Sequence, residues 1–188
     1  MSRTTTLVVI AAAALLPLDA RAQLQIKVGA SFASTTESDY VPDVKNQTGF
    51  AAGVGWGIPF GKRLDFYPEL LYVQKGAKYG DDAALKIDEL DLPIMLRWNI
   101  PIDVALPYLY AGPQLEFQLN CKAAGDDCID TNDFRWGAVL GLGVRLGGLV
   151  TLEGRYNWTF NDISNQIASK PRTILLLAGL DLGKRRGK

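Results

Sequence analysis

The side chains that could carry chemistry in this sequence are mainly carboxylates, because none of the 188 residues is histidine. Without histidine, Ser-His and Cys-His nucleophiles and the commonest zinc ligand are excluded. Asp88, Glu89 and Asp91 are close neighbours, and Asp65 and Glu69 form a second pair. Two such carboxylates could act as the acid and base of a glycosidase. Lysines and arginines are available to neutralise them, so we expect ion pairs and no catalytic residue.

Two glycine clusters invite comparison with nucleotide-binding loops. Residues 53–57 read Gly-Val-Gly-Trp-Gly, and residues 141–143 read Gly-Leu-Gly. Neither opens a predicted helix, and arginine follows Gly61-Lys62 where a phosphate-binding loop needs serine or threonine. We therefore expect no cofactor. Alternate glycines instead make room for large neighbours such as Tyr67 and let strands bend into a closed barrel.

Residues 1–22 have the pattern of a secretory signal peptide. An apolar segment at 7–16 follows a positive charge and is too short to span a membrane, and residues 20–22 (Ala-Arg-Ala) fit the cleavage pattern. We predict that cleavage leaves residues 23–182 as the folded domain and residues 183–188 as a basic tail. The alternative is a buried N-terminal helix.

The two cysteines, Cys121 and Cys128, are seven positions apart in a polar stretch. An exported chain meets an oxidising environment, which favours a disulfide closing a small loop. One cysteine pair without histidine is a poor metal site, and the spacing differs from the Cys-x-x-Cys redox motif. We predict a disulfide between Cys121 and Cys128 and no metal ion.

The charge balance excludes one class of partner. Twenty basic residues cancel 20 acidic ones, and no long run of like charge precedes the last few positions. A nucleic-acid surface needs a basic patch, so no nucleic-acid partner is expected. Beyond the predicted signal peptide, no run of apolar residues is long enough to span a bilayer as a helix.

From Leu24 onward, apolar and polar residues alternate with period two, which is typical of strands with unlike faces. In 150–160, for example, the residues that alternate from Val150 are mostly apolar and those that alternate from Thr151 are polar. One ordinary domain fits the chain length. We predict eight strands, at 24–34, 48–58, 63–76, 85–98, 106–119, 134–146, 150–160 and 171–182.

The predicted connections alternate in length. The long ones are 35–47, 77–84, 120–133 and 161–170, and the short ones are 59–62, 99–105 and 147–148. Outer-membrane barrels have short periplasmic turns and longer external loops, whereas a soluble sandwich has no reason to alternate. We predict an all-β, eight-stranded antiparallel up-and-down transmembrane β-barrel in the bacterial outer membrane, with both mature termini periplasmic. A soluble β-sandwich or a lipocalin-like barrel is the alternative.

The two faces of the strands indicate which side is the interior. A lipocalin-like barrel would turn its apolar face inward around a ligand. Here the rows of apolar residues are long and would have to be covered by lipid, so we place the charged face inside the barrel. Lys27, Lys75 and Asp181 lie on this face together with the predicted lumen charge network. That network comprises Asp65, Glu69, Glu89, Asp91, Arg97, Glu116, Arg135, Arg145, Glu153 and Arg155.

Aromatic residues of the apolar face gather near both ends of the predicted strands, as in the two interfacial girdles of a membrane barrel. The group near the short turns is Trp56, Phe60, Phe66 and Trp98. The group near the long connections is Phe32, Phe50, Tyr72, Phe117, Phe134, Trp136, Trp158 and Phe160.

Four stretches of the sequence resemble the PorT-like outer-membrane β-barrel domain family, in matching order and strand position. They are Glu-Leu-Leu-Tyr-Val-Gln-Lys-Gly at 69–76, Leu-Asp-Leu-Pro-Ile at 90–94, Pro-Tyr-Leu-Tyr-Ala-Gly-Pro at 107–113 and Gly-Arg-Tyr at 154–156. The resemblance implies an integral outer-membrane protein of a Bacteroidota-like bacterium. Its founding member is associated with protein secretion and gliding. Barrels of this type usually end on an aromatic residue, whereas the last strand here ends at 180–182 with Leu-Asp-Leu.

Three functions from different classes fit these expectations. The favoured one is a structural or interaction barrel, with no open pore and no enzymatic activity, that meets partners through its external loops. The second is a component of an outer-membrane protein secretion apparatus, and the third is a lipid-modifying outer-membrane enzyme, which the missing histidine disfavours. The expected partners are outer-membrane lipid and other envelope or secretion proteins. No small-molecule substrate is identified.

Overall fold

The computed structural model describes residues 23–35, 44–46, 48–79, 83–102, 105–123, 126–127, 133–161 and 171–182. The predicted signal peptide and basic tail lie outside these residues. Within these ranges, no helix is long and apolar enough to cross a membrane.

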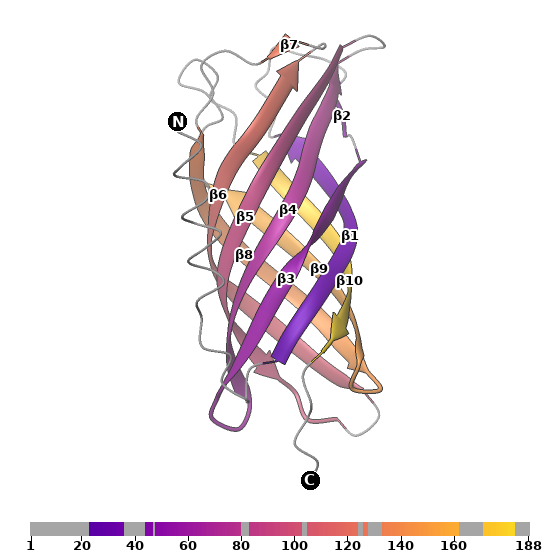
Figure 1. The fold of residues 1–188 in the computed structure, drawn as a ribbon, viewed down its shortest axis with the longest axis vertical. Coiled ribbons are helices and arrows are strands. Elements are labelled where there is room, and N and C mark those ends of the chain that lie inside the picture. The colour runs from indigo at the N-terminus through magenta and orange to yellow at the C-terminus, as the bar shows by residue number, and fades with distance from the viewer. Residues whose placement is uncertain are drawn as a thin grey trace.

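Eight long strands form the wall of a barrel (Figure 1). They are β1 (Gln23–Thr35), β3 (Thr48–Phe60), β4 (Leu64–Tyr79), β5 (Ala83–Asn99), β6 (Leu106–Ala123), β8 (Phe134–Leu146), β9 (Val150–Thr159) and β10 (Pro171–Asp181). Two short strands, β2 (Val44–Asn46) and β7 (Asp126–Asp127), pair with β4 and β6.

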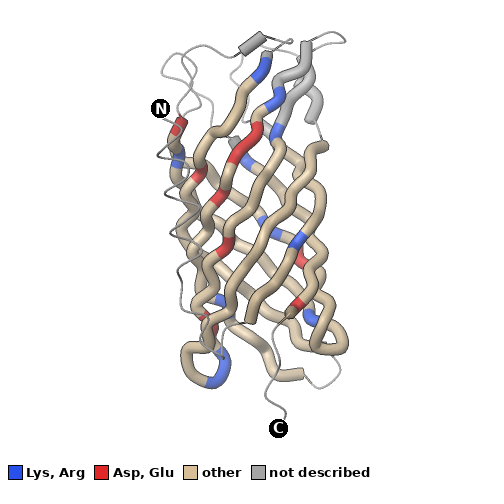
Figure 2. The backbone as a smooth tube through the Cα atoms, viewed as in Figure 1, with Lys and Arg blue, Asp and Glu red and all other residues tan. Residues whose placement is uncertain are grey.

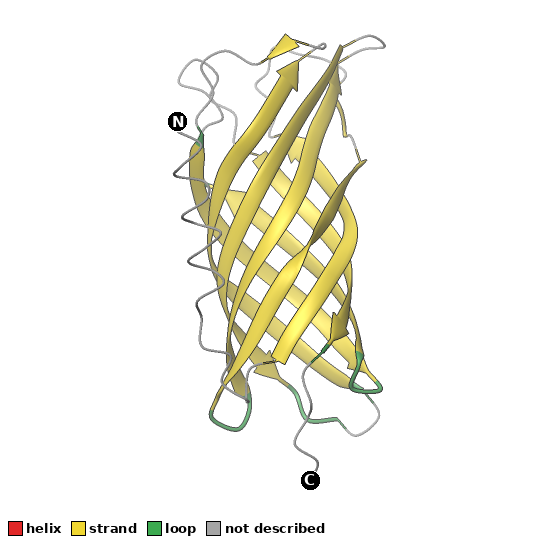
Figure 3. Ribbon diagram, viewed as in Figure 1, coloured by secondary structure: helices red, strands yellow, loops and turns green. Residues whose placement is uncertain are grey.

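Each long strand pairs antiparallel with the next, and β1 pairs with β10 to close the ring. This closing register runs from Gln25 opposite Asp181 to Thr35 opposite Pro171. The predicted eight-stranded up-and-down barrel is therefore confirmed. The turns 61–63 and 147–149 lie at the same end as the start of β1 and the end of β10 (Figure 3). Gly61, Gly147 and Gly148 have positive φ angles in these turns, which glycine adopts without steric cost.

Alternation along the strands separates an interior from an outer surface, with one shift in β6. On β8, Arg135 is 1% exposed whereas its neighbour Trp136 is 49% exposed. The outer surface consists mainly of apolar ladders, and the interior holds most of the charged side chains of the described strands. A shift of one residue in pairing would move every side chain to the other face. The arrangement suits a barrel whose outside meets lipid.

The prediction of a long loop at 77–84 is wrong. Strands β4 and β5 pair as far as Tyr79 opposite Ala83, which leaves only residues 80–82 between them. In the next hairpin, β6 continues to Ala123, beyond its predicted end at residue 119. Backbone hydrogen bonds can extend a strand pair where the side chains do not alternate between apolar and polar. The apolar periodicity alone therefore underestimates the lengths of these strands.

Strand β6 also contains a bulge that the sequence pattern does not indicate. Glu89 lies opposite Gln118, but Asp88 lies opposite Asn120, so Leu119 is an extra residue in β6. A bulge of this kind shifts the alternation, and the residues that follow it change face.

Strands β4, β5 and β6 extend further than the others at the end away from the short turns (Figure 1). Their outward side chains become polar there, in contrast to the apolar band below. These outward polar residues are Gln74, Lys86, Asp88, Asn120 and Lys122. We call this region the raised wall.

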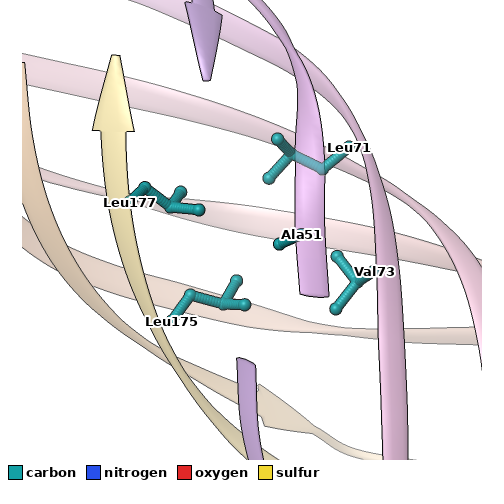
Figure 4. Packing of buried hydrophobic residues seen from close by; sticks show 5 residues of the cluster. All are labelled: Ala51, Leu71, Val73, Leu175 and Leu177. Carbon is teal, nitrogen blue, oxygen red and sulfur yellow. The ribbon is translucent and has the colours of Figure 1, made fainter. Parts of the chain in front are cut away.

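One part of the interior is apolar. Leu71 and Val73 of β4 and Leu175 and Leu177 of β10 are all buried, together with Ala51 of β3 (Figure 4). Strand β1 lies between these strands and contributes the small residues glycine and serine to the interior at this level. Small residues on β1 therefore allow leucines from both sides to meet inside the barrel.

Candidate functional site

The interior of the barrel holds every residue of the predicted charge network, together with Lys27, Lys75 and Asp181. All are buried except Asp65, whose side chain is 14% exposed. Charged positions occur along the whole length of the barrel (Figure 2). From the short-turn end upward they form three groups. The lower pairs are Asp65–Arg97 and Arg145–Asp181, the middle cluster is Lys27, Glu69, Glu153 and Arg155, and the upper cluster is Lys75, Glu89, Asp91, Glu116 and Arg135.

The middle cluster joins three strands, β1, β4 and β9, in a closed set of ion pairs. Arg155 Nη1 donates to Glu69 Oε2 at 2.6 Å and its Nη2 to Glu69 Oε1 at 3.1 Å, so this pair is bidentate. Arg155 also contacts Glu153 Oε2 at 2.9 Å. Lys27 Nζ forms ion pairs with Glu69 and, at 2.6 Å, with Glu153 Oε1. The two acids and two bases neutralise each other, as buried charges require.

Tyrosine hydroxyls complete the hydrogen bonding of Glu153. Tyr108 Oη donates to Glu153 Oε1 at 2.8 Å, and Tyr110 Oη donates to Glu153 Oε2 at 3.1 Å. Both rings need space on the neighbouring strand. A Cβ atom at Gly141 would lie 2.3 Å from the Tyr110 ring, and one at Gly143 would lie 2.5 Å from the Tyr108 ring. The second glycine cluster therefore accommodates these tyrosines.

The first glycine cluster has the same role. A Cβ atom at Gly55 would lie 2.6 Å from Tyr67 Oη, and one at Gly57 would lie 2.8 Å from Arg97 Nη2. Tyr67 Oη donates to Gln25, a buried residue that is not part of the predicted charge network. Gln25 Nε2 in turn donates to Thr151 Oγ1 at 3.0 Å, which links β1 to β9. Neutral inward side chains therefore form hydrogen bonds with one another across β1, β4 and β9.

The lower pairs lie near the short turns. Arg97 Nη2 is 2.7 Å from Asp65 Oδ2, and Asn99 Nδ2 donates to the same oxygen at 2.8 Å. Arg145 Nε is 2.6 Å from Asp181 Oδ2. These contacts separate Asp65 from Glu69, which belongs to the middle cluster. The two carboxylates therefore have different cationic partners, and they do not face a common substrate space.

The upper cluster has three acids and two bases. Lys75 Nζ lies 2.6 Å from Glu89 Oε2 and 3.4 Å from Glu116 Oε2. It is also 3.7 Å from Asp91 Oδ2. Arg135 forms ion pairs with Glu89 and, at 3.5 Å, with Glu116. With every group ionised, this cluster retains one negative charge, whereas the middle cluster and the lower pairs are balanced.

The acids of the upper cluster are close enough to hold a metal ion, with ligand oxygens of Glu89, Asp91 and Glu116 within 4.8 Å of one another. Lys75 already contacts all three, so its ammonium group occupies the position that a cation would take. Neutral groups contribute as well. Thr159 Oγ1 donates to Glu116 Oε1 at 3.0 Å. The arrangement favours an internal ion-pair network over a metal centre.

Asp88 is close to Glu89 and Asp91 in the sequence, but it lies on the outer face of the raised wall. Alternation along β5 separates it from its neighbours, which point inward. The three carboxylates therefore form no common acid and base arrangement.

Cys121 lies beyond the bulge in β6 and is 7% exposed. Cys128 lies outside the described residues, so the Cys121–Cys128 disulfide stays a prediction. We expect an alkylating reagent to modify neither cysteine of the purified mature protein until the protein is reduced. The reason is that the two cysteines form a disulfide in an oxidising compartment. Intact-mass measurement before and after reduction checks this. Two alkylated cysteines in the unreduced, unfolded protein would contradict it.

Solved structures share this fold at low sequence identity. Neisserial surface protein A (NspA) is 16% identical, with a TM-score of 0.56, and the match covers 86% of this chain and 97% of that chain. Ail of Yersinia pestis, solved with the heparin analogue sucrose octasulfate, is 14% identical, with a TM-score of 0.52 and 86% and 99% coverage. The outer-membrane enzyme PagL is 12% identical, with a TM-score of 0.52 and 81% and 97% coverage. At these identities the likeness concerns the fold alone.

No curated protein matches the sequence. A family model does: the outer membrane protein beta-barrel domain matches residues 13–165. This match spans most of the chain and agrees with the closed barrel, the apolar outer surface and the charged interior. It supports a location in the bacterial outer membrane. The chain belongs to the outer membrane protein beta-barrel domain family.

Proposed function

We propose that this protein is a closed outer-membrane barrel with a structural or interaction role, which meets partners at the raised wall and its connections. Both mature termini would then lie on the periplasmic side, next to the short turns. The filled interior is the observation that carries the proposal. An eight-stranded barrel encloses a lumen about wide enough for its own side chains, and here those side chains are paired charges.

The polar outer face of the raised wall supports an interaction role. Lys86, Asn120 and Lys122 are exposed there, outside the apolar band that suits lipid. A wall that extends beyond the membrane presents side chains to other molecules without changing the packing of the interior. We propose no catalytic role, because the inward carboxylates that could act as acid and base are engaged by lysine and arginine.

We expect planar bilayers that contain the purified protein to show no stable conductance steps. Water-filled channels generally need about twice as many strands, and an unpaired charge in so narrow a lumen would cost several kcal/mol. Single-channel recording checks this, with a large porin as the positive control. Reproducible ion-selective steps that disappear in Glu153→Gln would refute the closed interior and indicate transport.

A photo-crosslinking amino acid placed at Asn120 tests the interaction role in intact cells. This position is exposed on the raised wall, and Leu140, which is 52% exposed in the apolar band, is the matched lipid-facing control. The proposal expects a discrete protein adduct from position 120 that position 140 does not give. Equal yields from both positions, or none from either, would argue against a docking role for the raised wall.

A component of a secretion apparatus is the second candidate, and the resemblance to the PorT-like family is its support. The stretches that carry the resemblance include Glu69 and Arg155 of the middle cluster and Tyr108, which donates a hydrogen bond to Glu153 of that cluster. These residues therefore contribute to the construction of the barrel. Co-purification of other envelope proteins would test the secretion role. A lipid-modifying enzyme is the third candidate, and its support is that this chain shares its fold with the outer-membrane enzyme PagL. Lipid analysis of a deletion strain would test this alternative.

A further inference from the structure

A groove of about 540 Å³ lies on the outer surface at the turn between β3 and β4, at the short-turn end. Its lining surface is almost entirely apolar, and two of the residues that contribute to it are cationic. The lining residues are Phe60, Gly61, Lys62, Arg63, Leu64 and Trp98.

The apolar part of the groove is a row across three strands. Phe60 of β3 pairs with Leu64 of β4, and Leu64 pairs with Trp98 of β5. All three point outward, with exposed fractions of 71%, 38% and 47%. The next row toward the middle of the barrel is also apolar, with Phe66 opposite Leu96. The groove is therefore continuous with the surface that faces lipid hydrocarbon.

The polar part is the turn itself, which Figure 2 shows in the colour of lysine and arginine. Lys62 and Arg63 are both exposed and adjacent. The turn is held in place, because the backbone N–H of Asn99 donates to the carbonyl of Arg63 at 2.7 Å. The neighbouring Asp65 points into the barrel, where it is paired with Arg97. No acidic residue is among those that line the groove, so the two cations keep their charge available for a ligand.

We propose that this groove binds one anionic phospholipid from the membrane leaflet at the short-turn end. The phosphate and anionic headgroup lie beside Lys62 and Arg63, and an acyl chain packs on Phe60, Leu64 and Trp98. The occupant must combine negative charge with hydrocarbon, because the groove combines two cations with an apolar row. Tryptophan suits this boundary, since its ring is amphipathic and prefers the level of the headgroups. A second short turn, Gly147-Gly148-Leu149, carries no charge and serves as an internal contrast.

Trp98 reports directly on the groove. In a single-tryptophan variant that keeps Trp98, with the other three tryptophans of the chain replaced by phenylalanine, vesicles with brominated phosphatidylglycerol should quench fluorescence more than vesicles with brominated phosphatidylcholine. Each basic residue at an anionic membrane surface contributes about a fivefold preference, so both together should favour phosphatidylglycerol on the order of 25-fold. Lys62→Gln/Arg63→Gln should remove most of this preference, and Lys62→Arg/Arg63→Lys should retain it.

Two controls locate the effect. Lys86→Gln/Lys122→Gln removes two exposed cations at the other end of the barrel and should leave the preference at Trp98 unchanged. Heat-modifiable migration on gels verifies that each variant has folded. Equal quenching by both lipids, or a preference that survives Lys62→Gln/Arg63→Gln, would overturn the site. Loss of the preference on adding inorganic phosphate would also overturn it, because the turn would then bind a free anion rather than a lipid.

Discussion

Arg155→Leu should lower the free energy of unfolding by about 3 to 5 kcal/mol, the range expected when one partner of a buried ion pair is removed. Arg155 is 3% exposed and provides the bidentate contact to Glu69 as well as a contact to Glu153. Without it, Lys27 is the one remaining cation in the middle cluster and must neutralise two carboxylates. Urea unfolding of protein refolded into lipid vesicles measures the loss.

The control variants separate charge pairing from the loss of a large side chain. Arg172→Leu removes an exposed arginine of β10 and should change the free energy of unfolding by less than about 0.5 kcal/mol. Glu69→Gln added to Arg155→Leu removes the excess negative charge. Because the residues share one network, the double variant should be more stable than the sum of the single losses by about 1 to 3 kcal/mol. Strict additivity would mean that Arg155 acts through packing alone.

Leu142→Arg should cost about 2 to 4 kcal/mol of folding stability, as expected for a cation at the middle of the lipid-facing surface. Leu142 is 63% exposed, lies near the centre of β8 and has Leu109 and Gly154 as its cross-strand neighbours. Its new charge would have to reach an interface or draw water into the hydrocarbon. The same unfolding measurement in vesicles quantifies the cost.

Depth provides the matched control for this substitution. Leu146 lies on the same face at the end of β8 and is 41% exposed. Leu146→Arg should cost only about 0 to 1 kcal/mol, since the arginine reaches the interface. If the two variants were equally stable in lipid, the outer face of β8 would not cross the hydrocarbon and the membrane assignment of this surface would fail.

The surroundings of a side chain determine whether a charged or an apolar residue is stable there, and these surroundings differ between the interior and the outer surface. Inside the barrel, charges are stable because partners are within hydrogen-bond distance and neighbouring tyrosines supply further donors. Outside, apolar residues are stable because the surroundings are hydrocarbon. Tyr108 and Tyr110 can approach Glu153 only because the adjacent positions on β8 are glycines. The glycines of β8 therefore provide the room that the tyrosines need to donate hydrogen bonds to Glu153.

The amino-acid sequence by itself determined the number of long strands and the two faces of each. Period two is a local property: Arg135 and Trp136 must point to opposite sides in any strand, and only one side of a barrel in lipid tolerates a charge. The inward direction of Glu69, Arg97 and Glu153 follows from the same alternation.

Tertiary structure alone decided which charges meet and where the strands end. Lys27 and Glu153 are 126 positions apart and come together because β1 closes on β10 next to β9. The stagger of a closed barrel sets such pairs, and no local pattern encodes the stagger. The same holds for the bulge at Leu119 and for the extension of β4 and β5 to Tyr79 and Ala83. These features depend on backbone pairing between strands, which contributes hydrogen bonds whatever the side-chain pattern is.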